Sequence, residues 1–180
     1  MSRTISALVA AVLAVSGALA LASRDQAPAA AQMPAPAEHD WHSFAATWSA
    51  TGQLESLPTA GGGSASIVHF SGAVVVATGS GLSRGFRGDA IAFDDGRALT
   101  IGRAVWTDQH GDQIFSEMRG EPVQTGRRLD ATITGGTGRY VGIDGSFTLT
   151  WQYVVNPGDG TIQGRTAGLE GRYRHGTGQR

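Results

Sequence analysis

Hydrophobic and polar residues alternate over short distances along most of this chain. From Trp41 onward, glycines separate short runs of β-branched and aromatic residues, and no long stretch shows the 3.6-residue period of an amphipathic helix. Runs of this length and composition are typical of β-strands bounded by turns. The pattern predicts strands over residues 42–51, 66–78, 84–94, 98–108, 112–120, 128–134, 145–155 and 161–173.

Alternation is clearest in the seventh of these runs. Its large apolar residues occupy every second position and would share one face of a strand, because successive side chains of a strand point to opposite sides. These residues are Phe147, Leu149, Trp151, Tyr153 and Val155, and the positions between them include Ser146, Thr148, Thr150 and Gln152.

One hairpin can be predicted together with its register. Gln109, His110 and Gly111 form a loop with glycine where a left-handed backbone is needed, which pairs Asp108 with Asp112. Continuing that register places Thr107 opposite Gln113, Val105 opposite Phe115 and Arg103 opposite Glu117. The other face carries Ala104, Trp106, Ile114, Ser116 and Met118.

Both faces of this hairpin are substantially apolar, unlike a sheet with one wet side. A closed barrel whose outside is partly covered, by a terminal segment or a partner subunit, would explain such a pattern. We therefore predict an all-β fold, an eight-stranded antiparallel β-barrel of calycin-like appearance. Eight strands leave an interior that side chains fill or that holds one small ligand.

The N-terminal segment has the features of a signal peptide. Arg3 precedes an apolar run from about residue 7 to residue 22, and small residues then offer A-x-A cleavage sites at 18–20 or 20–22. We predict a signal peptide over 1–22, an Ala/Pro-rich flexible linker over 23–40, the barrel over 41–175 and a tail over 176–180. The expected location is secreted or periplasmic, with no stable membrane span after cleavage.

Composition excludes several kinds of chemistry. The chain has no cysteine, so disulfides, cysteine zinc sites and thiol nucleophiles are ruled out. It also has no lysine, which removes phosphate-loop and Schiff-base lysines. The net charge is −1 with acids and bases interspersed, which does not fit a nucleic-acid binder. We expect no cofactor.

A glycine-rich stretch carries a resemblance to known families. Residues 135–149, GGTGRYVGIDGSFTL, are similar to the pattern G-G-x-G-x-[FY]-x-G-x-x-G-x-[VF]-x-L that links two late strands in allene oxide cyclases, and dirigent proteins carry a similar segment. A looser likeness to bacterial secreted proteins of this barrel type lies around residues 106–108 and 111–115. Physically, the glycines permit unusual backbone conformations while Tyr140 can plug the barrel end.

The resemblance implies a fold more than an activity. The glycine segment is architectural in these families, and their catalytic and pocket residues do not map onto this chain residue by residue. Cofactor-free cyclisation, or stereochemical guidance of radical coupling, is thus an alternative function that the resemblance implies.

Two motifs are better explained without chemistry. Residues 81–85, GLSRG, match the serine-hydrolase elbow G-x-S-x-G, but that motif needs a strand–turn–helix and here precedes another strand. Residues 38–42, EHDWH, cluster metal-ligand types where the linker meets the first strand. Solvated polar residues explain that cluster better than a metal site, which needs converging ligands with fixed partners.

Arg103 and Glu117 are the most interesting charged pair. If their face points into the barrel, they lie beside Val105 and Phe115 in an apolar pocket, and Arg165 could join them from a strand face that it shares with Ala167 and Leu169. Arg103 and Arg165 would then bind a carboxylate or polarise a carbonyl, and Glu117 would be a catalytic general acid or base. The competing interpretation is a structural cross-strand salt bridge.

Aromatic residues have two interpretations as well. Trp106 and Tyr153 would fill the core or, together with Phe115, contact a ligand. Three functions follow: a barrel that binds a small hydrophobic or carboxylate- or carbonyl-bearing ligand, a cofactor-independent cyclase or isomerase, and a homo-oligomeric surface protein.

Overall fold

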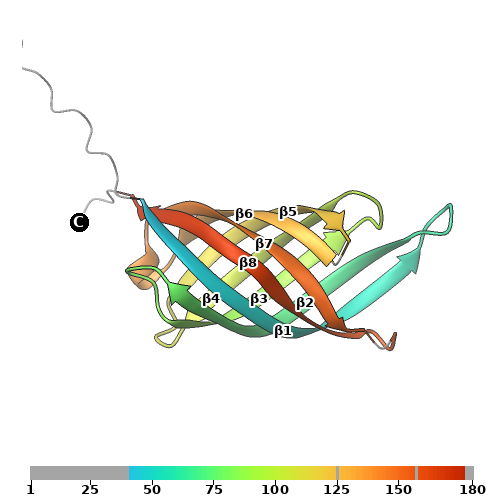
Figure 1. Ribbon diagram of the computed structural model, residues 1–180, viewed down its shortest axis with the longest axis horizontal. Helices are drawn as coiled ribbons and strands as arrows, with labels where there is room; N and C mark the ends of the chain where they lie inside the picture. The colour runs from blue at the N-terminus through green and yellow to red at the C-terminus, as the bar shows by residue number, and fades with distance from the viewer. Residues whose placement is uncertain (1–40, 125, 157, 177–180) are drawn as a thin grey trace, which may run out of the picture. The chain divides into compact units, whose positions relative to one another are not determined.

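The computed structural model describes residues 41–124, 126–156 and 158–176, which form one closed antiparallel β-barrel (Figure 1). Each strand pairs with its neighbours in sequence, and the last strand pairs with the first. The prediction of an eight-stranded barrel is confirmed. The strands are β1 (His42–Pro58), β2 (Ser64–Thr78), β3 (Gly85–Asp94), β4 (Thr100–Asp108), β5 (Gln113–Val123), β6 (Gly126–Gly136), β7 (Ile143–Val155) and β8 (Thr161–His175).

The first and last strands close the barrel. Their register runs from His42 opposite Tyr173 to Gln53 opposite Thr161. β1 continues to Pro58, past the predicted end at residue 51, and pairs with β2 as a hairpin that projects beyond the other strands (Figure 1). The barrel thus has one end with the loops 79–84, 109–112 and 137–142 and another with the loops 59–63 and 95–99.

The interior is filled by apolar side chains from every strand. The predicted β4–β5 register is confirmed, with Arg103 opposite Glu117 and Thr107 opposite Gln113, and Gly111 in the loop has φ +85°. The face that carries Trp106, Ile114 and Met118 points into the core, where each of these side chains is at most 4% exposed.

The opposite face of this hairpin points outward, so the condition under which Arg103 and Glu117 would line a pocket is not met. Their side chains are 66% and 49% exposed. The sequence alone could not show which face of this hairpin is buried, because apolar residues also lie on the outer face. Ile91, Phe93 and Ile101 lie on the outer surface and are 54%, 40% and 40% exposed.

β8 contains a bulge that changes which side chains face inward. Thr148 pairs with Glu170 whereas Thr150 pairs with Ala167, so β8 has an extra residue here, next to Gly168 at φ +64°. Leu169 is consequently buried, while Arg165 is exposed on the outer face. The expectation that Arg165 shares a face with Leu169 is therefore wrong.

Tyr140 and Tyr173 seal the end that contains loop 137–142, which we call the Tyr140 end. Both residues are fully buried; Tyr140 packs on Phe86 and Tyr173 on Phe44, with ring centroids 5.8 and 6.1 Å apart. The Tyr173 hydroxyl donates to the carbonyl of Ser80 in the β2–β3 loop. The expectation that Tyr140 plugs a barrel end is confirmed.

Asp108 is the buried anchor of this seal. Its carboxylate accepts from the Tyr140 hydroxyl at 3.1 Å and from the backbone N–H groups of His110 and Asp112, and Arg139 pairs with it at 3.1 Å. Burial raises the pKa of Asp108, but these donors outweigh it and hold the pKa below 3.8. Burial, with the neighbouring Asp108, raises the pKa of Tyr140 to about 12.

The predicted signal peptide and linker lie outside the described residues, as does most of the tail. No helix in the described ranges is long and apolar enough for a membrane crossing. Within the same ranges, no three His, Asp or Glu side chains are placed to hold a metal ion.

Replacing Asp108 by Asn should destabilise the barrel by about 2 kcal/mol at pH 7, because a buried charge-assisted network is lost. A carboxylate whose folded pKa is lowered stabilises the fold above its unfolded pKa, and this contribution disappears as pH falls through the folded pKa. The variant should therefore lose less stability than wild type between pH 5 and about pH 2. Urea unfolding across that range measures the free energy of unfolding of both proteins. Asp130 is exposed, so Asp130→Asn serves as the control. Equal acid sensitivity of Asp108→Asn and wild type would refute the assignment.

Candidate functional site

The opposite end of the barrel, which we call the Asp94 end, contains a partly open apolar cavity of about 40 Å³. It is lined from inside the barrel by residues of β1 to β7. The apolar lining consists of Val68, Ala90, Ala92, Met118 and Leu129, the aromatic lining of Trp48, Phe70, Trp151 and Tyr153, and the polar lining of Asp94, Thr100 and Arg127.

Aromatic rings form one side of the cavity. The ring centroids of Phe70 and Trp151 are 4.4 Å apart, and those of Trp48 and Trp151 are 5.0 Å apart. Trp48 and Trp151 are each 3% exposed, whereas Tyr153, near the end of β7, is 38% exposed. The rings are thus buried toward the core and reach the surface at Tyr153. Such contacts favour flat or cyclic apolar groups.

An ion pair spans the barrel at this end. Arg127 of β6 contacts the Asp94 carboxylate of β3, although these strands are not neighbours in the sheet. Their side chains are only 18% and 14% exposed. The Asp94 carboxylate also accepts from the Thr100 hydroxyl at 3.2 Å and from the Gly96 N–H at 2.7 Å. Asp94 therefore fixes the β3–β4 loop and the position of Arg127 together.

Three residues of the lining carry a buried donor that lacks a partner. The indole Nε1 atoms of Trp48 and Trp151 and the Nη1 atom of Arg127 contact no hydrogen-bond acceptor within the described part of the chain. All three atoms are donors, and buried polar groups in folded proteins are normally paired. Three residues of the lining thus carry polar atoms that are buried and unpaired within the described residues.

Tyr153 connects the aromatic side of the cavity with the ion pair. Burial raises the pKa of its hydroxyl; the nearby Arg127 charge lowers this pKa, and the Asp94 charge raises it. Tyr153 therefore remains neutral at physiological pH. It contributes a ring and a neutral hydroxyl rather than an anion.

The structure places the sequence-predicted site residues in different parts of the barrel. Arg103 and Glu117 do form a salt bridge, at 3.0 Å, but on the outer surface. Phe115 is partly exposed on the same outer face, and Arg165 is exposed on β8. None of these four residues lines the cavity at the Asp94 end.

The two remaining predicted residues are inside the barrel. Tyr153 lines the cavity. Trp106 is 3% exposed and packs against Phe86 and Phe147, nearer the Tyr140 end, with ring centroids 5.8 and 5.1 Å away. Trp106 is thus a core residue away from the cavity, in agreement with the core-filling interpretation.

Sequence reasoning missed Asp94 and Arg127. Residues 94–96 have the composition of a turn, and Asp94 does bind the turn backbone, which hides its second role. Arg127 begins a strand directly after a turn. One signal for this pair was present in the sequence. Asp94 and Arg127 have opposite charges and stand at strand ends that a closed barrel places at the same end.

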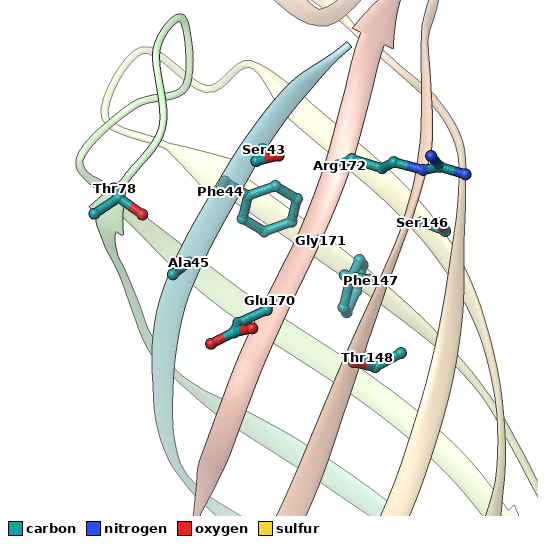
Figure 2. A pocket seen from close by; sticks show the side chains of 10 residues that line it. All are labelled: Ser43, Phe44, Ala45, Thr78, Ser146, Phe147, Thr148, Glu170, Gly171 and Arg172. Atoms are coloured by element: carbon teal, nitrogen blue, oxygen red, sulfur yellow. The ribbon is translucent and has the colours of Figure 1, made fainter.

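A second hollow, of about 530 Å³, lies on the outer surface of β1, β8 and β7. Figure 2 shows the rings of Phe44 and Phe147 on either side of Gly171, which has no side chain to cover them. Polar side chains, among them Ser43, Thr148 and Glu170, also line this hollow. This hollow is wide and shallow, and none of the buried unpaired donors belongs to a residue that lines it.

A third hollow lies outside β2, β3 and β4. It measures about 390 Å³ and is lined by Ile67, Ile91, Phe93, Ile101 and Arg103, among others. Arg103 thus does stand beside apolar residues, but on the outside of the barrel.

Comparison of the chain with family models, curated proteins and solved structures finds no match in any of the three.

The mostly buried Arg127–Asp94 ion pair and the exposed Arg103–Glu117 ion pair should differ in their contribution to stability. Asp94→Ala leaves Arg127 mostly buried and unpaired and removes the acceptor of two further donors, so it should lower the free energy of unfolding by about 2–3 kcal/mol. Arg103→Ala removes an exposed pair and should cost less than about 1 kcal/mol. Urea unfolding of both variants measures the difference. Equal costs would contradict the structural role of the Arg127–Asp94 pair.

Proposed function

We propose that this protein is an exported β-barrel that binds a small hydrophobic molecule with a carboxylate or carbonyl group in the cavity at the Asp94 end. The observation that carries this proposal is a partly open cavity whose lining is apolar and aromatic and includes the Arg127–Asp94 ion pair. Binding sites for small molecules are typically apolar concavities with a few polar groups that fix orientation.

The difference between the two barrel ends supports the choice of this cavity. At the Tyr140 end, two buried tyrosines fill the interior and the buried carboxylate of Asp108 is fully engaged. At the Asp94 end, the cavity is partly open. A ligand therefore has an entrance at this end.

The remaining parts of the proposal come from the sequence. Arg3 and the apolar run that follows support export. The GGTGRYVGIDGSFTL segment supports kinship with the barrel of allene oxide cyclases and dirigent proteins. Ligand binding is favoured over a cyclase or isomerase activity because the assigned acid or base, Glu117, is on the outer surface. Asp94, the acid of the cavity lining, is engaged by Arg127, Thr100 and Gly96.

Toluene should bind the full chain saturably, because the aromatic lining accepts a small flat apolar molecule at the cavity mouth. Ala90→Val adds volume inside the cavity and should abolish binding, whereas Ala73→Val adds the same volume on the outer face of β2 and should leave it intact. Saturation-transfer-difference NMR of toluene measures both. Binding that survives Ala90→Val, or no binding to wild type, would overturn the proposal.

A second function, assembly with further copies of this chain, is favoured by the outer apolar face. Ile67, Phe93 and Ile101 are direct cross-strand neighbours on β2, β3 and β4, and Ile67 is 51% exposed. Arg103 and Glu117 lie beside them with opposite charges. A second copy related by a two-fold axis would cover the apolar residues and match each charge with its opposite.

If this face is a dimer interface, Ile91→Lys should shift the protein from dimer to monomer, because it places a charge among apolar side chains. Val154→Lys is a matched control on β7, away from the face, and should not change the assembly. Sedimentation velocity of the full chain, 18.6 kDa as a monomer, separates the outcomes. A wild-type protein that sediments as a monomer at high concentration would eliminate this function.

A further inference from the structure

We propose that Met118 sets the size of the ligand that the cavity at the Asp94 end accepts, and that the hydrophobic part of this ligand is a single aromatic ring. The inference rests on the proposed function and narrows its ligand class. It follows from the volume of the cavity, from the kinds of side chain that line it and from the position of Met118 on β5.

The cavity is too small to enclose a whole ring. Its volume is about 40 Å³, whereas a cavity that holds benzene in another protein measures about 150 Å³. Because the cavity is partly open, a ring can begin to enter at the mouth, but it can be enclosed only if a side chain of the lining moves. The ligand that the cavity accepts therefore depends on which lining residue can move.

The aromatic and the charged parts of the lining are held in place. The ring centroid of Trp151 lies 4.4 Å from that of Phe70 and 5.0 Å from that of Trp48. Arg127 and Asp94 hold each other in a mostly buried ion pair. Movement of these side chains would separate packed rings or break the ion pair, and both changes are costly. They form the fixed part of the cavity wall.

Met118 is the most adaptable side chain of the aliphatic lining. Ala90 and Ala92 have no side-chain rotamers that could open space, and the branched side chains of Val68 and Leu129 have less rotamer freedom than methionine. Methionine is unbranched, with three rotatable bonds, and adapts to spaces of irregular shape. A ring that enters the cavity should therefore displace Met118 before any other residue.

Met118 also bounds the cavity on the side of β3, β4 and β5. Ala92, Gly102 and Met118 are cross-strand neighbours on these strands. Ala92 and Met118 line the cavity. Gly102 has no side chain, and a Cβ atom at this position would lie 3.2 Å from the Met118 Cε atom. The end of the Met118 side chain thus covers Gly102, and moving it aside would enlarge the cavity there.

An aromatic ring fits these walls better than a saturated ring of the same carbon number. Aromatic rings make favourable contacts with a methionine sulfur and with other aromatic rings. Met118 and Trp151 supply these two kinds of contact from different strands of the lining. A flat ring also displaces Met118 less than a puckered ring does. The ligand class that follows is a monocyclic aromatic compound.

The Met118 methyl group can report on ligand entry directly, because the chain has only three methionines, Met1, Met33 and Met118. The full chain is labelled with ¹³C at the methionine methyl groups. Toluene, methylcyclohexane and 1-methylnaphthalene are titrated into it and followed by NMR. The Met118 cross-peak is assigned with the Met118→Leu variant. Met1 and Met33 precede the barrel in the sequence and serve as internal controls.

Toluene should shift the Met118 methyl cross-peak of the wild type, because its ring lies against this side chain. It should bind about threefold to tenfold more tightly than methylcyclohexane, the gain expected from aromatic contacts. 1-Methylnaphthalene should bind about tenfold more weakly than toluene, because its second ring overpacks the cavity.

Met118→Ala removes the side chain that limits the size of the ligand, so 1-methylnaphthalene should then bind more tightly than toluene. Ile114→Ala is the matched control, because Ile114 lies on the same strand, is 3% exposed and does not line the cavity. It should keep the wild-type order of the two compounds. Met118→Leu conserves the volume but lacks the sulfur, so it should fold like the wild type and weaken toluene binding about threefold. This variant decides the case if Met118→Ala does not fold.

The other outcomes separate the two proposals. Toluene binding without a shift of the Met118 cross-peak, the wild-type order of affinities in Met118→Ala, or the wild-type toluene affinity in Met118→Leu would overturn the role of Met118 while leaving ligand binding intact. Equal affinity of the wild type for toluene and methylcyclohexane would overturn the aromatic assignment. If toluene does not bind the wild type at all, the proposed function itself is overturned.

Discussion

The pairing of β1 with β8 is the constraint on which the rest of this structure depends. It joins residues as far apart as His42 and Tyr173, and it turns a sheet with two free edges into a barrel without any. Only after closure does one face of every strand become an interior. The bulge near Gly168 belongs to the same constraint, because it changes the register along β8 so that Ile162 and Leu169 both point inward, at 0% and 1% exposure.

Closure creates two ends, and the buried polar groups of the two ends differ in how many of their hydrogen bonds are formed within the protein. Asp108 at the Tyr140 end is buried, and its carboxylate is engaged by Tyr140, Arg139 and two backbone N–H groups. At the Asp94 end the balance is reversed, because Asp94 is satisfied while donors of Arg127, Trp48 and Trp151 are left over. A buried carboxylate whose acceptor sites are occupied by protein donors seals one end. The other end keeps a partly open cavity.

Local sequence determined what could be predicted. Gly111 in a short loop, with alternation on both sides, was enough for the β4–β5 register, because a hairpin involves only neighbouring residues. The inward face was not predictable, because apolar Ile101 and Phe115 lie outside while small Ala104 and Ser116 lie inside. Arg165 was misplaced by a bulge that no local pattern indicated. The Arg127–Asp94 pair was missed because it joins strands β3 and β6 across the barrel, a contact that only closure creates.

The leftover donors also bear on why the cavity should not be regarded as a packing defect. A buried donor without a partner costs about 1–3 kcal/mol, and three of them approach the net stability of an ordinary domain, about 5–15 kcal/mol. A lining kept only for packing would replace Trp48 or Trp151 by phenylalanine at little cost in burial and would lose that penalty. Both positions nevertheless carry indole rings, beside an arginine whose charge Asp94 already balances. Under the proposed function, what these positions supply to a ligand is the large aromatic surface of the two rings.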